Sequence, residues 1–233
     1  MARPPLVISH AACAGHAPEN TLAGVEKALA LGADAVEVDV RATADGVPVL
    51  LHDETLDRTT DGRGPLRSLP LSAVRALDAG QGQRVPTLAE VVAAVRGRAL
   101  LVAELKEVGI EAQVEAALAP LGDEGAEVWS FLPAVLARVG RMAPRRRRVL
   151  LVGAEAMGRW PEPLRLAREV GTAGLSVRHE ALTRRVAAAV REAGLLLYAW
   201  TADDPRDLQR LLTLAPAGIV TNYPERLRPL LRG

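Results

Sequence analysis

The stretch Ala35-Val36-Glu37-Val38-Asp39-Val40 sets two carboxylates into an otherwise apolar run. Residues two apart in a β-strand share a face, so Glu37 and Asp39 lie on the same side. Acids inside an apolar strand are costly unless they are paired or bound to a cation. The stretch therefore predicts a buried strand that carries functional acids near its C-terminal end.

Eight further β-like runs alternate with amphipathic helices on both sides of this stretch, which is typical of a parallel α/β fold. The runs are 6–10, 47–52, 99–105, 126–131, 149–153, 172–177, 195–200 and 218–221. Helices are expected over 20–31, 87–96, 110–118, 132–142, 163–170, 182–193 and 205–212. This order predicts a TIM-like (β/α)8 barrel that forms a single domain over residues 1–233.

A closed barrel of this type needs eight strands, and the sequence offers nine candidates. The turn Ala44-Asp45-Gly46 joins two of them without a helix, so one of these two runs is expected to be a hairpin arm. Residues 54–84 show little periodicity and are expected to form a loop-like excursion over one end of the barrel. Open sheets are disfavoured, because the sequence has neither the Gly-x-Gly-x-x-Gly turn of a Rossmann fold nor a Walker loop.

Charge and composition narrow the class of protein. The formal net charge of +1 argues against a nucleic-acid partner, which normally requires a basic excess. The only dense basic run, 145–148, is expected to be a solvated turn before a strand. The single cysteine, Cys13, permits no intrachain disulfide. With no signal-peptide-like start and no apolar run of membrane-spanning length, the sequence predicts a cytoplasmic chain without stable membrane insertion, and it leaves the oligomeric state open.

The ends of the predicted strands carry further polar side chains. His10 ends the first run, His52 ends the third, and Glu104 and Lys106 stand two apart at the end of the fourth. Active sites of TIM barrels lie at the C-terminal ends of the strands. Three acids converging there offer hard oxygen ligands for Mg²⁺ or Ca²⁺, whereas no Cys/His cluster supports zinc.

A cation beside two histidines indicates phosphoryl chemistry. One histidine removes a proton and the other donates one to the leaving alkoxide, while Lys106 stabilises the negative charge that develops. The structural alternative is a set of plain ion pairs such as Glu104 with Lys106, but six such groups at strand ends favour a functional site. A serine hydrolase is disfavoured, because the sequence has no Gly-x-Ser-x-Gly elbow.

The sequence resembles the glycerophosphodiester phosphodiesterase family over nearly its whole length, with the matching motifs in the same order. The motifs that carry the resemblance are Pro18-Glu19-Asn20-Thr21-Leu22, Glu37-Val38-Asp39-Val40, Leu51-His52-Asp53-Glu54-Thr55-Leu56-Asp57-Arg58-Thr59-Thr60, Pro86-Thr87-Leu88, Glu104-Leu105-Lys106, Ala199-Trp200-Thr201 and Ile219-Val220-Thr221-Asn222-Tyr223-Pro224. The resemblance implies a TIM barrel that cleaves glycerophosphodiesters to glycerol 3-phosphate and an alcohol.

The same resemblance implies roles for individual residues. The acids Glu37, Asp39 and Glu104 would hold one divalent cation, and His10 and His52 would be the acid–base pair. Lys106 would contact the phosphate, and Trp200 would line an apolar wall near the glycerol. Glu19 and Asn20 would cap the first helix and brace the site. A glycerol hydroxyl of the substrate would attack phosphorus, and water would open the resulting cyclic phosphate.

Two departures from the family pattern leave alternatives open. His-Arg-Gly is usual at the end of the first strand, whereas this chain has His10-Ala11-Ala12, so it is either an enzyme in which Arg41 or Arg58 compensates or a catalytically impaired phosphodiester-binding homologue. The loop 78–84 is short and has no aromatic residue. A lysophospholipase-D-like activity on lipids is the remaining alternative, and one Phe and two Tyr give it little support. The alcohol group of the substrate stays undetermined.

Overall fold

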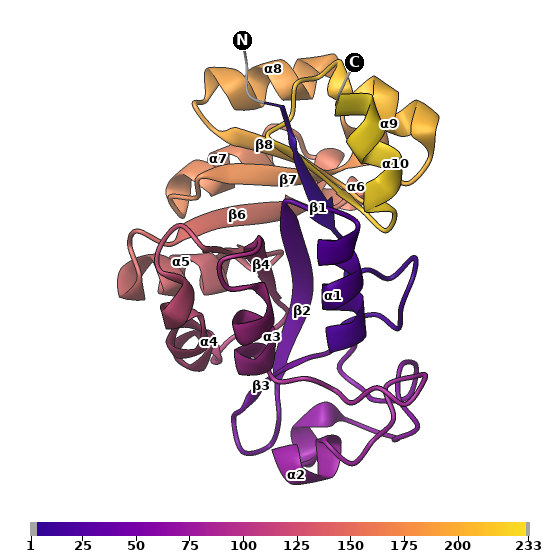
Figure 1. Ribbon diagram of the computed structural model, residues 1–233. Coiled ribbons are helices and arrows are strands. Elements are labelled where there is room, and N and C mark those ends of the chain that lie inside the picture. Colours follow the sequence, from indigo (N-terminus) through magenta and orange to yellow (C-terminus); the bar gives the residue numbers. More distant parts are fainter. Residues whose placement is uncertain (1–3, 232–233) are drawn as a thin grey trace.

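Eight parallel strands close into a barrel in the computed structural model, which describes residues 4–231 (Figure 1). The ring closes where β1 (Leu6–Ser9) pairs with β2 (Ala35–Ala42) on one side and with β9 (Gly218–Thr221) on the other. Between β2 and β9 the ring continues through β4 (Leu100–Leu105), β5 (Ala126–Ser130), β6 (Arg147–Val152), β7 (Gly174–Arg178) and β8 (Leu196–Trp200). The predicted TIM-like barrel in a single domain is therefore confirmed.

The ninth strand, β3 (Pro48–Leu50), lies outside the ring. It runs antiparallel to β2, with Val49 opposite Arg41. The Asp-Gly turn between the two strands makes this hairpin, as the sequence predicts. The hairpin matters for the site because β3 runs back along β2, so that the Leu51 N–H donates to the Asp39 carbonyl oxygen at 3.1 Å and His52, the next residue, is brought near Asp39.

Seven longer helices cover the outside of the barrel at the predicted places, with ends shifted by one or two residues. They are α1 (Leu22–Ala30), α3 (Leu88–Val95), α4 (Glu111–Leu118), α5 (Pro133–Met142), α7 (Glu162–Glu169), α8 (Arg184–Glu192) and α9 (Pro205–Leu212); α2 (Leu71–Val74), α6 (Ala154–Met157) and α10 (Pro224–Leu227) are single turns. The expected cap at Glu19 and Asn20 is wrong, because Thr21 caps α1 by accepting a hydrogen bond from the Gly24 N–H at 3.2 Å.

Strand alternation separates the barrel interior into layers. One cluster of buried side chains fills the interior, formed by Ile8, Ala35, Val102, Trp129, Val149, Leu151, Tyr198 and Val220. Residues two positions further along these strands face the same way, one layer nearer the C-terminal mouth. They include His10, Glu37, Glu104 and Asn222. An apolar layer therefore supports a polar layer at the mouth, where the candidate site lies.

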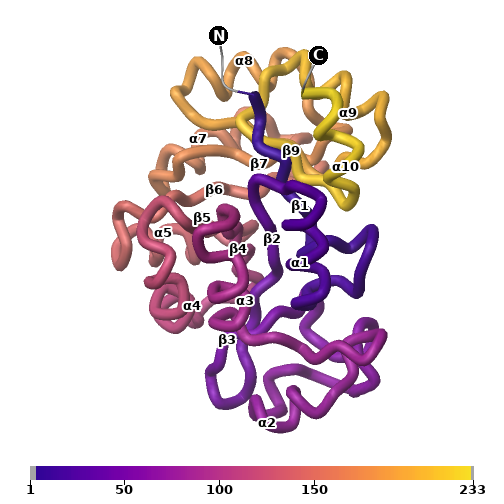
Figure 2. The backbone as a smooth tube through the Cα atoms, in the orientation of Figure 1, coloured from indigo at the N-terminus to yellow at the C-terminus, as the bar shows by residue number. Residues whose placement is uncertain are grey.

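The excursion 54–84 packs around a small core of its own. Leu56, Leu66 and Val74 are fully buried there together with Val49 of β3. The segment contains the single-turn helix α2 and lies on the opposite side of the molecule from the two chain ends (Figure 2). These apolar residues are too irregularly spaced to show helical or strand periodicity, which explains why the sequence indicates only a loop.

The arginine run 145–148 is more structural than the sequence suggests. Arg146 is buried and donates to the carbonyl oxygens of Gly122 and Ala126, so the expectation of a fully solvated turn is wrong. Arg148 donates to the carbonyl oxygens of Val170 and Gly171 at the end of α7. Arg148 thus satisfies carbonyl groups that the end of α7 leaves without partners, and Arg146 satisfies carbonyl groups at Gly122 and at the start of β5. Arg146 and Arg148 therefore hold the start of β6 against the neighbouring segments that carry these carbonyl groups.

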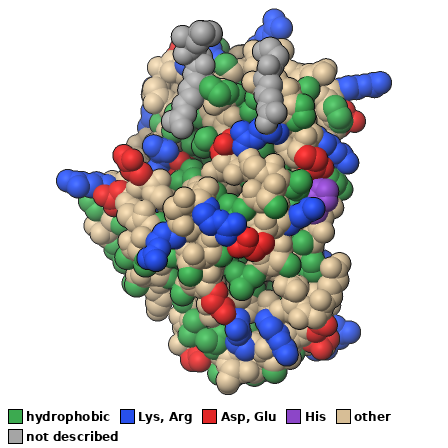
Figure 3. All heavy atoms as spheres, in the orientation of Figure 1, with side chains coloured by type: hydrophobic (Ala, Val, Ile, Leu, Met, Phe, Trp, Pro, Cys, Tyr) green, Lys and Arg blue, Asp and Glu red, His purple; other side chains and the backbone are tan. Residues whose placement is uncertain are grey.

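The outer surface agrees with the near-neutral net charge. On the face shown in Figure 3, blue Lys and Arg side chains alternate with red Asp and Glu side chains. Within residues 4–231, none of the helices combines the length and the apolar character that a membrane crossing requires.

Candidate active site

Three carboxylates meet at the C-terminal mouth of the barrel. Glu37 and Asp39 come from β2 and Glu104 from β4, where the pairing register sets Asp39 beside Glu104. One oxygen from each of the three residues lies within 4.8 Å of the others, and all three side chains are buried. The predicted acids therefore form one cluster of the size that a single metal ion can bridge.

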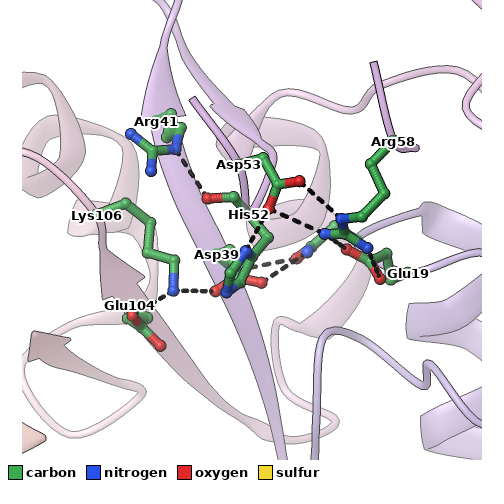
Figure 4. A network of polar contacts seen from close by, with 9 residues as sticks. Glu19, Asp39, Arg41, His52, Asp53, Arg58, Glu104 and Lys106 are labelled. Atoms are coloured by element: carbon green, nitrogen blue, oxygen red, sulfur yellow. Dashed lines mark hydrogen bonds and ion pairs between the residues drawn. The ribbon is translucent and has the colours of Figure 1, made fainter. Parts of the chain in front are cut away.

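Hydrogen bonds satisfy this cluster only in part, and Figure 4 shows the contacts of Asp39 and Glu104. The Lys106 ammonium lies 2.5 Å from Glu104 Oε1 and 3.1 Å from Asp39 Oδ1. Asn20 donates to Asp39 Oδ2 at 2.7 Å, so it does brace the site as expected. Glu37 Oε2 accepts from the Ala11 N–H at 2.8 Å, but Glu37 Oε1 is buried without any partner among the described residues.

The protonation of the cluster follows from its burial. Burial raises the pKa of Glu37 well above its usual value, and the nearby Asp39 and Glu104 carboxylates raise it further. Burial also raises the pKa of Glu104. For Asp39 the effect of burial is outweighed by Lys106 and by the Asn20 hydrogen bond, so its pKa lies below the usual value. The single positive charge of Lys106 therefore does not compensate for the free-energy cost of burying three carboxylates.

A divalent cation fits these residues. Mg²⁺ and Ca²⁺ prefer carboxylate oxygens, and the unpartnered Glu37 Oε1 is buried at the centre of the cluster. A carboxylate oxygen without a partner in a buried position is costly, and a bound cation removes that cost.

His10 follows the last residue of β1 and lines the cavity that the three carboxylates also line. Its Nδ1 lies 2.8 Å from Asn222 Oδ1, and Asn222 in turn donates its Nδ2 to Asp203 at 2.7 Å. Because the amide nitrogen of Asn222 is used in this way, its oxygen must accept, so His10 carries its proton on Nδ1. The lone pair of His10 Nε2 is therefore free to face the cavity.

His52 has a different partner. Its Nδ1 lies 2.7 Å from Asp53 Oδ1, and Arg58 donates to Asp53 Oδ2 at 2.7 Å and also pairs with Glu19 (Figure 4). The Arg58 hydrogen bond, and then that of His52, holds the pKa of Asp53 below its usual value. Arg41 Nε donates to the His52 carbonyl oxygen at 2.9 Å and fixes the backbone at this turn. A carboxylate partner stabilises a protonated imidazole ring, whereas an amide oxygen adds no charge.

Arg41 and Arg58, the two candidates to compensate for the arginine that the family pattern places after His10, both have other partners, and Arg41 borders an adjoining cavity beside His52 and Lys106. Arg41 pairs with Glu107 at 3.6 Å in addition to holding the His52 backbone, and Arg58 is engaged by Asp53 and Glu19. The described residues that line the cavity include neither of them. Ala11 itself is buried and adopts a left-handed backbone conformation, with φ of 44°.

These groups surround one cavity of about 210 Å³. Its polar side is formed by His10, Glu37, Asp39, His52, Glu104 and Lys106, and its apolar side by Trp129, Phe131, Leu151, Trp200, Thr201 and Val220. Every residue that the sequence assigns to the site lines this cavity. Trp200 donates its Nε1 to the Ser176 carbonyl oxygen at 3.0 Å and packs edge-on against Phe131 at 5.5 Å.

Sequence reasoning missed Phe131, Asn222 and Asp203. Phe131 and Asn222 each follow an interior residue by two positions at a strand end, so the rule that identifies Glu104 also applies to them. Asp203 lies in the loop after β8 and offered no such signal.

The fold and this cavity define a TIM-barrel protein with a carboxylate, histidine and lysine site at the mouth of the barrel. Residues 10–226 match the model of the glycerophosphoryl diester phosphodiesterase family, and the chain belongs to this family.

Known proteins of similar sequence and structure agree with this membership. A glycerophosphodiester phosphodiesterase of Caldanaerobacter subterraneus subsp. tengcongensis is 33% identical, with 97% of this chain and 98% of that protein covered. A phosphodiesterase of Oleispira antarctica, solved in complex with the product sn-glycerol-3-phosphate, has a TM-score of 0.89 at 28% identity, with 99% and 98% covered. A glycerophosphodiester phosphodiesterase of Agrobacterium tumefaciens has a TM-score of 0.85 at 30% identity, with 97% and 100% covered.

Proposed function

We propose that this protein hydrolyses glycerophosphodiesters to glycerol 3-phosphate and an alcohol. The observation that carries the proposal is the convergence of three buried carboxylates, two oriented histidines and one lysine on a single cavity. Family membership and the product bound to the Oleispira antarctica relative support the same substrate class.

Glu37, Asp39 and Glu104 would hold one divalent cation, Mg²⁺ or Ca²⁺. When bound, such a cation neutralises phosphate oxygens. Lys106 lies 3.1 Å from Asp39 at the edge of this cluster, where its ammonium is within reach of a phosphate oxygen. This fixed charge favours the more negative transition state over the substrate.

The two histidines take different roles because their partners differ. His10 Nε2 removes the proton from a glycerol hydroxyl of the substrate, which then attacks phosphorus. His52, whose Nδ1 lies 2.7 Å from Asp53 Oδ1, donates a proton to the departing alcohol oxygen. In the second step the roles reverse: His52 removes a proton from water, the water opens the cyclic phosphate, and His10 returns its proton to the glycerol oxygen. Both histidines end in their starting states.

A coupled assay for glycerol 3-phosphate tests the proposal. Purified protein is given glycerophosphocholine or glycerophosphoethanolamine with Mg²⁺ or with Ca²⁺, and again with EDTA. We expect turnover with cation, loss of turnover with EDTA, and loss of at least 10²-fold in kcat for His10→Ala and for His52→Ala. His16→Ala, at an exposed ion pair with Glu225, is the matched control and should retain full activity.

Ala11 supports a second candidate, a phosphodiester-binding homologue with impaired turnover. The described lining residues include no arginine, so Lys106 and the histidines are the cationic side chains that face the phosphate. Folded, cation-binding protein that shows no turnover with either cation would favour this candidate over the enzyme.

A further inference from the structure

A second cavity of about 190 Å³ adjoins the active-site cavity, and the two share Phe131 and Leu151. Leu150 and Val152, which also line it, belong to the core between the barrel and the helices. The rest of its lining comes from β6 to α7 and comprises Gly153, Ala156, Arg159, Glu162, Pro163 and Leu166. The two cavities, which border one another at Phe131 and Leu151, are here together called the rim groove, and the second of them lies over the end of β6.

Gly153 lies where the rim groove crosses the barrel wall. A Cβ atom at this position would meet Phe131 Cε1 at 4.0 Å, which is ordinary van der Waals contact, and any longer side chain would extend into the passage. The backbone of Gly153 has φ of −77° and ψ of 169°, a conformation open to every L-residue. The backbone therefore does not require a glycine here, and its effect is to leave the passage free.

The chemistry of the rim groove favours an apolar ligand over a cationic one. Phe131 is 42% exposed although it is large and apolar, and it borders both cavities. The guanidinium of Arg178 already lies over the Trp200 ring, 5.8 Å from its centroid. At the far end, Arg159 pairs with Glu162 at 3.3 Å. Because Arg159 and Glu162 balance each other, the described lining of the second cavity offers no unpaired carboxylate to a choline or ethanolamine cation, whereas an aliphatic chain would bury the exposed phenyl ring.

We propose that the rim groove binds an aliphatic chain on the leaving alcohol of the substrate. This inference rests on the proposed function and names its substrate class: glycerophosphodiesters of aliphatic alcohols. The glycerol hydroxyls and the phosphate require polar partners, which the carboxylates, histidines and Lys106 supply. Leu151 and Phe131 border the same cavity on its apolar side, and the second cavity begins at these two residues, so we assign this side to the leaving alcohol.

A series of glycerophospho-n-alkyl esters with two, four, six and eight carbons tests the inference through release of glycerol 3-phosphate. These leaving alcohols have nearly the same acidity, so differences in kcat/KM report binding of the chain. Each methylene buried in the groove should raise kcat/KM by about fourfold until the groove is full. The variant Gly153→Leu should abolish this rise and leave the two-carbon ester unaffected, while Gly153→Ala should keep most of the rise. Leu166→Phe narrows the groove from α7 and provides a second, independent variant.

The outcomes separate this inference from the proposed function. No turnover of any ester overturns both. Equal turnover of all four esters, or an unchanged rise in both Gly153→Leu and Leu166→Phe, overturns the groove and leaves the phosphodiesterase standing. Lysophosphatidylcholine of matched chain lengths, followed by choline release, carries its chain on the glycerol instead. A chain effect seen only with these lipids would overturn the assignment of the groove to the leaving alcohol.

Discussion

Glu37→Gln is the substitution that most directly tests the carboxylate cluster. The amide has the shape of the carboxylate and can still accept the Ala11 N–H, which lies 2.8 Å from Glu37 Oε2. It removes the negative charge from Oε1, a buried oxygen that has no hydrogen-bond partner among the described residues. The fold should therefore persist while the cation loses one of its three carboxylates.

The magnitude follows from linkage between binding and unfolding. A cation present at 100 times its Kd stabilises the folded protein by about 2.7 kcal/mol. For a chain of 233 residues this raises Tm by about 5–11 °C. If the substitution weakens binding by about a hundredfold, the same cation concentration gives about 0.4 kcal/mol, or about 1–2 °C. Differential scanning calorimetry with Mg²⁺, with Ca²⁺ and with EDTA measures each value.

Glu37→Gln also tests how the stability of the folded protein depends on pH when EDTA removes the cation. The pKa of Glu37 is raised in the folded protein, so the folded state holds this proton to higher pH than the unfolded state does. The wild type therefore loses stability as pH rises from the unfolded pKa, about 4.3, through the folded one. Glu37→Gln has no such proton, so its Tm should exceed that of the wild type by a margin that grows with pH.

Three results would refute this reasoning. The first is a wild type that gains no stability from either cation, the second is a Glu37→Gln variant that keeps the full gain, and the third is a Glu37→Gln variant less stable than the wild type at pH 8 in EDTA. Glu26→Gln is the matched control, because Glu26 is an exposed partner of Arg98 far from the cluster. This control should keep the full gain of the wild type.

Three other predictions concern the neighbouring groups. Ala11→Arg, which restores the family residue, should raise kcat/KM for glycerophosphocholine by about 10²-fold, and a folded variant without gain would show that the arginine is dispensable here. Asn222→Ala should lower kcat by at least tenfold with little change in KM, because His10 loses the amide oxygen that orients its Nδ1–H; an unchanged kcat, or a change in KM alone, contradicts the positioning role. Arg146→Met breaks a buried pair with a carboxylate and should cost about 3–5 kcal/mol, or about 6–20 °C in Tm, whereas exposed Arg145→Met should change stability by less than about 0.5 kcal/mol; equal Tm values for the two variants would refute the structural role of Arg146.

The sequence predicts the barrel and the cluster of acids for one physical reason. Strand alternation is local, so Glu37, Asp39 and Glu104 can be assigned to an inward face without knowledge of the fold. Parallel strands then bring these faces to one end of the barrel. The hairpin arm and the helix positions follow from equally local patterns of turns and spacing.

What the sequence could not show depends on contacts between distant segments. The Asn222 amide meets His10 only because barrel closure sets β9 beside β1, 212 residues away in the sequence. The composition records one phenylalanine but not its position in the fold. Only the packing of β5 against β6 places Phe131 in the lining of both cavities. Arg146 is buried because carbonyl groups of a neighbouring loop lie within reach, and no local pattern reports this.

The two ends of the barrel interior balance buried charge in opposite ways. Near the N-terminal end, Glu127 is buried but fully satisfied: Arg147 and Trp129 donate to its two oxygens at 2.7 and 2.9 Å. That acid and that arginine cancel, so the floor of the barrel is neutral without a ligand. At the mouth, three carboxyl groups lie around the single ammonium of Lys106, so their full ionisation would leave an excess of two negative charges over this lysine. One divalent cation would neutralise this excess. The free-energy cost of burying the acids is therefore offset by a bound ligand, and this happens at the end of the barrel that is open to substrate.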